Sequence, residues 1–453
     1  MNGGLFDPVS VRLMLQRELA QKADQGFEVE MLVARLAATG DRPAELLGFA
    51  EELAAAPRRR DWEFVEPDDL PGILCECDPA RPPGRIGKIT PSEAEERVRA
   101  AFLARLCGCM LGKPVEGCAD LLRLREAGLH VGEWPLANYV TQAFLDALGS
   151  RHPSWKETVR EHICAVAPDD DINYTLLAML VMEEHGLDFT RDDLRRAWLH
   201  HLPSGWTWGP ERVFLTRAAG ATLASDDETA DVGDQRMRDW MTTLCPDAEL
   251  CGAAIRADAY GYACPGDPAR AAALAWRDAG MTHRGTGIYG AMFIAAAIAA
   301  APVSRSPLEV FATALRFVPR RSRFYSIASD CLSIVESAGD WIAAYGEIHL
   351  RYSRYGFCQI YQECGTLMNT LRFARDTNDG ICIQVSQGND TDSFGATAGS
   401  LLGQWFGPGG LSPRWTEPFR NTIHTALADF HDQDLSRVVQ RMGLLPRLTV
   451  LPR

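Results

Sequence analysis

The chain has 453 residues, of which 46% are hydrophobic and 23% charged, as in an ordinary globular protein. Its formal net charge of −14 argues against a general nucleic-acid-binding protein, because contact with phosphates requires a basic surface. The same charge does not exclude a phosphorylated small substrate if a bound cation supplies positive charge locally.

Apolar residues recur with a helical period along almost the whole chain. Residues 1–65 contain amphipathic segments such as "VRLMLQRELAQKA" and "PAELLGFAEELAAA", which predict an N-terminal helical extension. Residues 66–93 are rich in Pro and Gly and are expected to form a linker. Residues 94–453 are predicted to form one catalytic domain of helices joined by short loops, although "GICIQVSQ" could be a strand. The fold class expected is all-α.

The cysteines and the termini indicate the compartment. Thirteen cysteines are scattered along the chain, and two C-x-C pairs without paired CxxC motifs give no reason to expect structural zinc. The N-terminus shows no basic segment followed by an apolar one, and "GAMFIAAAIAAAPV" reads as too short and Ala-rich for a membrane span. We therefore expect a reduced, cytoplasmic protein without a membrane partner.

The first acidic cluster lies in "VAPDDDINYTLLAML". Asp169 could be the N-cap of a helix, with Asp170 and Asp171 stabilised by the positive end of the helix dipole. Alternatively, the three carboxylates could form a site for a hard cation such as Mg²⁺ or Mn²⁺. This stretch alone is compatible with both interpretations.

A second acidic cluster lies in "QGNDTDSFGATAGSLLGQWFG", ahead of a run of small residues suited to a tightly packed buried helix. Asp390, Asp392 and Ser393 could be directed to one point from a tight turn that Gly388 permits. Helix caps remain an alternative here as well. If the fold brings both clusters together, their repulsion would require a cation between them.

Four motifs together resemble the ADP-ribosylglycohydrolase family, of which the chain looks like a divergent member similar to dinitrogenase reductase-activating glycohydrolase. "GNDTDSFGATAGSLLG" resembles the family's G-G-D-T-D-[ST] signature, and "DDDINYTLL" is similar to T-D-D-T-x-x-T-L. "ARLCGCMLGKPVEG" resembles G-D-A-L-G-x-P-x-E, with Glu116 on the acidic position. The segment from Gly266 to Ala301 resembles the central helices with their Ser/Thr-His turn. The four motifs follow the family's order.

The resemblance implies an all-α enzyme with two Mg²⁺ (or Mn²⁺) ions that hydrolyses the bond at the distal ribose of ADP-ribose, on a protein or a small molecule. Such cleavage builds oxocarbenium character that carboxylates stabilise, while a divalent cation polarises water and fixes ribose hydroxyls. The resemblance assigns metal binding to Asp169, Asp170, Asp171, Asp390, Asp392 and Ser393, catalysis to Glu116 and Asp171, and substrate binding to Gly112, His283, Gly287, Gly388 and Asn389.

Several residues depart from the family pattern. Asp169 and Ile172 stand where Thr is usual, Cys109 replaces an Asp, and Asn389 replaces a Gly. The four central aspartates are retained, so we expect metal binding to survive. The departures bear more on the identity of the substrate than on the chemistry.

Other residues carry weaker signals, and two other functions stay open. Arg284 is a candidate diphosphate partner, and Trp206 and Trp208 could stack a base or simply pack at the surface. The alternatives are an N-ribosyl hydrolase of a nucleoside or NAD-derived metabolite, and a non-catalytic ADP-ribose binder. Cys109 and the missing Thr residues favour the binder, while Glu116 and the aspartates oppose it.

Overall fold

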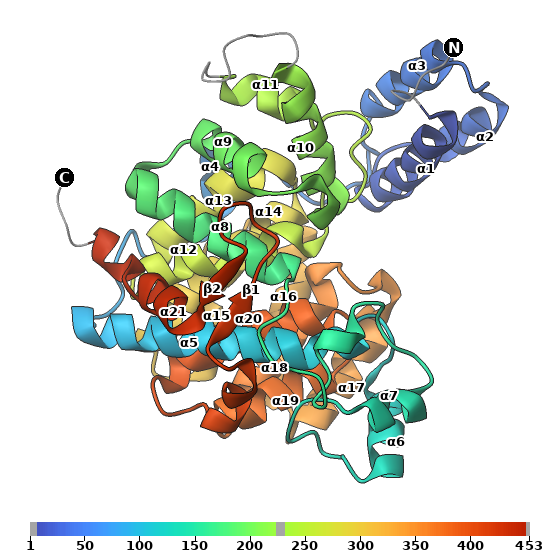
Figure 1. Ribbon diagram of the computed structural model, residues 1–453. Helices are drawn as coiled ribbons and strands as arrows, with labels where there is room; N and C mark the ends of the chain where they lie inside the picture. The colour runs from blue at the N-terminus through green and yellow to red at the C-terminus, as the bar shows by residue number, and fades with distance from the viewer. Residues whose placement is uncertain (1–6, 223–231, 450–453) are drawn as a thin grey trace.

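A computed structural model describes residues 7–222 and 232–449 of the chain (Figure 1). Helices make up most of it, and β1 (Thr422–His424) pairs with β2 (Asp432–Asp434) in an antiparallel two-stranded sheet. The expectation of an all-α fold is confirmed.

The N-terminal extension consists of α1 (Pro8–Asp24), α2 (Glu30–Ala38) and α3 (Pro43–Ala54), which lie at one side of the main body (Figure 1). Asp7 caps α1 by accepting hydrogen bonds from the backbone N–H groups of Val9 and Ser10. The three helices have a small apolar core of their own, separate from the main core: Leu15, Leu19, Val29, Leu36, Leu46, Phe49, Ala50 and Leu53.

The segment between the extension and the main body is packed against that body. It contains the short helix α4 (Leu70–Glu76). Ion pairs join Glu66 to Arg323 at 2.9 Å and Glu76 to Arg321 at 2.8 Å. The Pro/Gly-rich residues 66–93 thus follow one defined course over the main body.

The main body is built from helices that succeed one another through short loops and 3₁₀ turns. Its α-helices are α5 (Pro91–Gly112), α6 (Leu121–Val131), α7 (Gln142–Leu148), α8 (Asp170–His185), α9 (Arg191–His201), α10 (Gly209–Thr222), α11 (Asp234–Asp239), α12 (Asp258–Ala263), α13 (Pro268–Thr282), α14 (Thr286–Ala300), α15 (Pro307–Leu315), α16 (Arg323–Ser337), α17 (Trp341–Tyr352), α18 (Ile360–Phe373), α19 (Thr377–Ser386), α20 (Thr391–Phe406) and α21 (Leu435–Gly443). Its 3₁₀ helices are η1 (Lys113–Val115), η2 (Trp155–Glu157), η3 (Gly186–Asp188), η4 (Ser204–Trp206), η5 (Cys251–Arg256), η6 (Ala301–Val303), η7 (Ser353–Tyr355), η8 (Pro413–Trp415), η9 (Glu417–Phe419) and η10 (Leu445–Thr449).

Two expectations about apolar segments need correction. "GICIQVSQ" forms most of α19 rather than a strand, because Ile381 and Val385, four residues apart, share a helix face that is fully buried. Residues 286–303 are long and apolar enough for a membrane span, so their length does not exclude one, but 89% of this stretch is buried inside the protein. It is accounted for as the central helix of the core, where every residue of α14 is buried.

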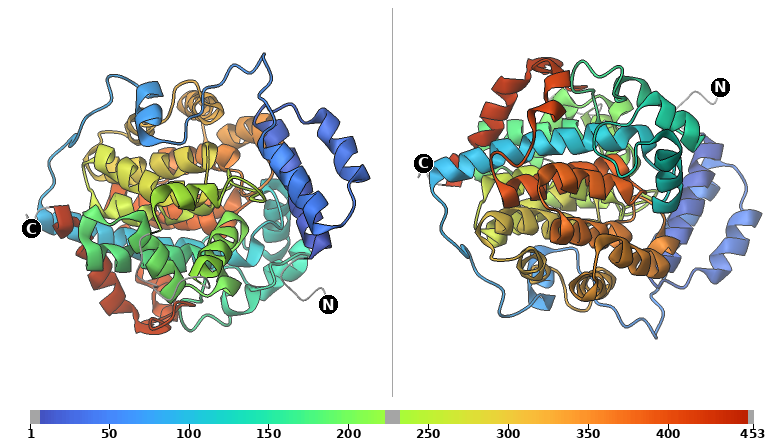
Figure 2. Two further views of the ribbon diagram at one scale, coloured as in Figure 1. Left: turned by 90° about the horizontal axis from the view of Figure 1, so that it is seen from above. Right: turned by 90° about the horizontal axis from the view of Figure 1, so that it is seen from below.

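Helices α5 and α20 pack antiparallel with their backbones in contact. The view from below in Figure 2 shows α5, in cyan, alongside the orange-red C-terminal helices. A Cβ atom on Gly108 would lie 1.9 Å from the carbonyl oxygen of Gly395, and one on Gly399 would lie 2.2 Å from that of Ala104. Only glycine permits so close an approach. The small residues that the sequence predicted to suit a buried helix thus allow the backbones of α5 and α20 to approach closely.

This contact predicts that Gly399→Ala and Gly346→Ala differ in their effect on the stability of the protein. Gly399→Ala should destabilise the protein by about 1–3 kcal/mol, the usual cost of overpacking, because a backbone oxygen cannot move aside. Gly346→Ala is the control, because Gly346 is exposed in α17 and an added Cβ meets nothing within 4 Å. It should be neutral or stabilise by up to about 1 kcal/mol. Urea unfolding measures both, and equal effects would contradict the role of the α5–α20 contact.

Candidate functional site

The two acidic clusters and the end of α5 meet in space. The carbonyl oxygen of Gly112, the last residue of α5, accepts a hydrogen bond from Thr391 Oγ1 at 2.7 Å. This contact brings Glu116 beside the start of α20, where its carboxylate lies within 4.8 Å of those of Asp390 and Asp392. Ser393 Oγ donates to Asp171 Oδ2 at 3.3 Å and so joins the second cluster to the first.

Asp169 caps α8, as the simpler interpretation of the first cluster predicted. Its Oδ1 accepts a hydrogen bond from the backbone N–H of Asp171 at 3.0 Å, and its own backbone is extended. Ligand atoms of Asp169, Asp171 and Cys109 nevertheless lie within 4.8 Å of one another. The cap uses only Oδ1 of Asp169, and the other oxygen, Oδ2, lies 2.9 Å from Nζ of Lys113.

Asp390 does not cap its helix. It occupies the N-cap position of α20, yet its side chain makes no cap hydrogen bond. Gly388 and Asn389 precede it with φ values of +77° and +67°, and this left-handed turn directs the chain into the helix. Its Oδ2 accepts a hydrogen bond from Cys251 Sγ at 3.2 Å. The cap interpretation therefore fails for the second cluster.

Three buried carboxylate oxygens in the clusters have no hydrogen-bond partner: Oδ1 of Asp171, of Asp390 and of Asp392. Burial raises the pKa of Asp390 to about 7, with a contribution from the charge of Asp392, and burial also raises the pKa of Asp171. The guanidinium of Arg105 lies 4.0 Å from Asp171 Oδ1. Buried carboxylate oxygens without a hydrogen bond are costly. An oxygen-rich set of this kind suits a hard cation such as Mg²⁺ or Mn²⁺, so the residues fit the implied metal.

Lys113 supplies a positive charge that the sequence analysis did not anticipate. Its Nζ lies 2.7 Å from Asp392, 2.9 Å from Asp169 and 3.0 Å from Glu116. Burial alone would lower the pKa of Lys113, but the charges of Asp169 and Asp392 raise it well above the usual range. The expectation that a bound ion must supply the cation between the clusters is therefore incomplete, because the chain places a charged side chain there.

Glu116 lies at the edge of the clusters, with its side chain 19% exposed and its Oε2 3.4 Å from Nε2 of His152. Burial and the negative charge of Asp392 raise the pKa of Glu116 to about 10. Burial also lowers the pKa of His152. Glu116 can thus carry a proton at neutral pH beside an uncharged imidazole. His152 was missed in the sequence, where no motif surrounds it.

Three glycines and Asn389 assigned to substrate binding have packing or turn roles. A Cβ on Gly112 would lie 2.0 Å from the carbonyl oxygen of Thr391, and one on Gly388 would lie 2.3 Å from that of Ala119. A Cβ on Gly287 would lie 2.7 Å from the ring of His283. Their contribution to substrate binding stays a prediction, as does that of Asn389.

His283 and Arg284 are held by the protein itself. His283 is fully buried, with Nδ1 2.7 Å from Thr282 Oγ1 and Nε2 3.6 Å from Glu211. Arg284 donates to the carbonyl oxygens of His283 and Arg238 at 2.6 and 3.2 Å. Contact of either side chain with substrate also stays a prediction.

A cavity of about 410 Å³ reaches the acidic clusters through Lys113 and Asp169. Its wall includes Trp206, which is 36% exposed, and Lys156. The size is within the range of small-molecule sites. The remaining lining residues are Cys109, Met110, Ser154, Glu157, Thr158, Ala167 and Pro168.

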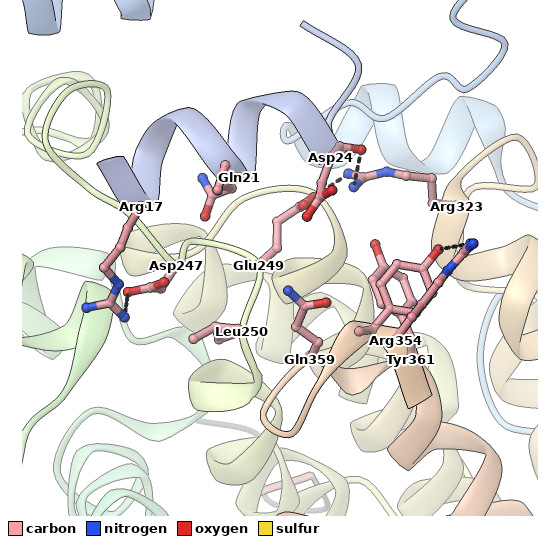
Figure 3. A pocket seen from close by; sticks show the side chains of 12 residues that line it. Arg17, Gln21, Asp24, Asp247, Glu249, Leu250, Arg323, Arg354, Gln359 and Tyr361 are labelled. Carbon is pink, nitrogen blue, oxygen red and sulfur yellow. Dashed lines mark hydrogen bonds and ion pairs between the residues drawn. The ribbon is translucent and has the colours of Figure 1, made fainter. Parts of the chain in front are cut away.

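A second cavity of about 510 Å³ lies between α1 and the main body (Figure 3). Arg17 pairs there with Asp247, and Arg323 pairs with Glu249 at 2.6 Å and donates to the backbone oxygen of Asp24. The clustered carboxylates do not line it. In each of these ion pairs the two charges neutralise each other. This cavity therefore does not have the concentration of negative charge found beside the first cavity.

Comparison with known proteins agrees with the acidic site. The model of the family described as ADP-ribosylglycohydrolase matches residues 90–444. A solved structure titled "ADP-ribosylglycohydrolase-related protein complex" has 18% sequence identity, covers 79% of this chain and 99% of its own, and superposes with a TM-score of 0.48. No curated protein matches. The family match covers most of the chain, including both acidic clusters and Glu116, so the protein belongs to the ADP-ribosylglycohydrolase family and is a glycosidase-type hydrolase.

Proposed function

We propose that the protein hydrolyses the glycosidic bond at the distal ribose of an ADP-ribosylated protein or small molecule and requires Mg²⁺ or Mn²⁺. The observation that carries this proposal is the pair of buried carboxylate oxygens without a hydrogen-bond partner on Asp390 and Asp392, whose carboxylates lie within 4.8 Å of that of Glu116. Family membership supports the reaction class.

The cation would be held by oxygen atoms of both clusters. Asp171, Asp390 and Asp392 offer their unpartnered oxygens, and Asp170 at the start of α8 and Ser393 in the first turn of α20 lie beside them in the chain. When bound, a divalent cation polarises a water molecule and orients ribose hydroxyls. The carboxylates also stabilise the positive charge that develops on the ribose ring.

The charges around Glu116 suit it to donate a proton to the leaving atom. Burial and the negative charge of Asp392 raise its pKa, which favours its protonated form. Burial alone would raise the pKa of Asp392, but Lys113 lowers it, so Asp392 stays ionised. Neighbouring carboxyl groups whose pKa values are separated in this way divide into an acid and a negatively charged partner.

The cavity over the clusters offers contacts for the rest of the substrate. Trp206 presents an aromatic surface on which a base can stack, and the ammonium of Lys156 suits a diphosphate. The overall negative charge makes nucleic acid an improbable partner. A cytoplasmic location is supported by the cysteines, all of which are free thiols.

The direct test is the release of free ADP-ribose from modified proteins and from model N- and O-glycosides, with and without Mg²⁺. Mg²⁺-dependent release supports the proposal. Cleavage confined to nucleosides or NAD-derived metabolites would instead assign a small-molecule N-ribosyl hydrolase. Tight ADP-ribose binding without turnover on any substrate would assign a binding protein.

Metal binding should increase the stability of the folded protein. Adding Mg²⁺ at about 100 times its dissociation constant should stabilise the protein by about 2.7 kcal/mol and raise its melting temperature. Asp390→Asn should remove most of this effect, because it removes an unpartnered charged oxygen. Asp146→Asn is the control, because Asp146 is exposed and pairs with Arg151 at the surface. Melting curves indifferent to both EDTA and Mg²⁺ would contradict a metal site.

Glu116→Gln should separate binding from chemistry. The amide keeps size and hydrogen bonding but lacks the acidic proton, so turnover should fall by about a hundredfold or more while ADP-ribose affinity and metal content change only a few-fold. Glu157→Gln, in the wall of the same cavity, should behave like the parent protein. Parent-like turnover by Glu116→Gln would exclude the acid role, and loss of metal would make Glu116 a ligand.

A further inference from the structure

The ammonium of Lys113 is held by the carboxyl groups of three residues from three segments of the chain. Asp169 comes from the start of α8, Asp392 from the first turn of α20, and Glu116 from the segment after η1. The distances of 2.7 to 3.0 Å are those of charge-assisted hydrogen bonds. A lysine ammonium has three N–H donors, so each donor has one carboxylate. The side chain is 12% exposed and therefore mostly shielded from water.

The clustered carboxylate oxygens divide into two groups around this ammonium. Asp169 Oδ2, Glu116 Oε2 and Asp392 Oδ2 are taken by Lys113. The Oδ1 atoms of Asp171, Asp390 and Asp392 have no hydrogen-bond partner. Asp392 belongs to both groups, with one oxygen on Lys113 and the other open. The carboxylates of Asp390 and Asp392 lie within 4.8 Å of each other and are therefore close enough to share one further cation.

A second divalent cation at the Lys113 position would meet two obstacles. The ammonium already uses the oxygens that would coordinate the ion, and two cations at contact distance repel strongly where water is scarce. The oxygens of Asp390 and Asp392 on the other side remain open to a cation. The geometry therefore favours one fixed ammonium and one exchangeable ion.

We propose that this site holds a single divalent cation, beside Asp390 and the open oxygen of Asp392, and that Lys113 occupies the place of a second ion. This inference rests on the proposed metal-dependent hydrolysis and revises the expectation of two ions. It makes Lys113 a positioning residue that fixes Asp169, Glu116 and Asp392 without a second metal.

The number of bound ions tests the inference. Metal-free protein is titrated with Mn²⁺, bound metal is counted by equilibrium dialysis, and electron paramagnetic resonance distinguishes an isolated Mn²⁺ from a spin-coupled pair. The parent should bind one isolated ion. Lys113→Met should bind two ions with a coupled spectrum, because it removes the ammonium and frees three carboxylate oxygens. Lys113→Arg, which keeps the charge, and Lys156→Met, in the same cavity wall, should each bind one ion.

Each outcome is decisive, and the count does not depend on substrate. Two coupled ions in the parent, no bound ion in the parent, or a single ion in Lys113→Met would overturn the inference. The parent titration alone still tests it if Lys113→Met fails to fold, which circular dichroism would reveal. Failure to cleave any ADP-ribosyl bond with one ion bound would refute the proposed function and leave the ion count standing.

Discussion

The site depends on the backbone contact between α5 and α20. Because Gly108, Gly112, Gly395 and Gly399 have no side chains, the two helices lie so close that a Cβ on any of them would lie within 2.6 Å of a backbone oxygen of the other helix. The helices run antiparallel, so the end of α5 meets the start of α20. This arrangement places Lys113 and Glu116 beside Asp392, although Lys113 and Asp392 are 279 residues apart in the chain. Rigid helix packing, rather than a loop, thus positions the reacting groups.

The consequence of this packing is a concentration of negative charge that the protein balances in three ways. Lys113 neutralises part of it, Glu116 can hold a proton, and three carboxylate oxygens remain open for a cation. The same environment divides the carboxyl groups by role: Lys113 lowers the pKa of Asp392, while burial and the charge of Asp392 raise the pKa of Glu116. Binding of metal and supply of a proton are thus two results of one arrangement of charge.

The N-terminal extension contributes differently. It has its own apolar core, and it contacts the main body through ion pairs such as Arg17 with Asp247 around the cavity in Figure 3. The segment that follows is held by Glu66 and Glu76, which pair with Arg323 and Arg321. These charges are paired within the interface. That cavity is larger than the one over the acidic clusters, but none of the clustered carboxylates lines it.

The sequence by itself determined the helical class and the carboxylates, because helical periodicity and acidic helix starts are local properties of the chain. It also predicted the tight turn at Gly388, which the positive φ confirms. Only the tertiary structure decided which carboxylates cap helices and which are open: Asp169 and Asp390 begin helices alike, yet only Asp169 caps. It likewise revealed Lys113, a variable position in the motif, as the cation between the clusters. It also placed Ile381 and Val385 in a helix, against their preference for strands. The reason is the same in each case: burial and charge balance arise from contacts between distant segments, and these exist only once the helices have packed.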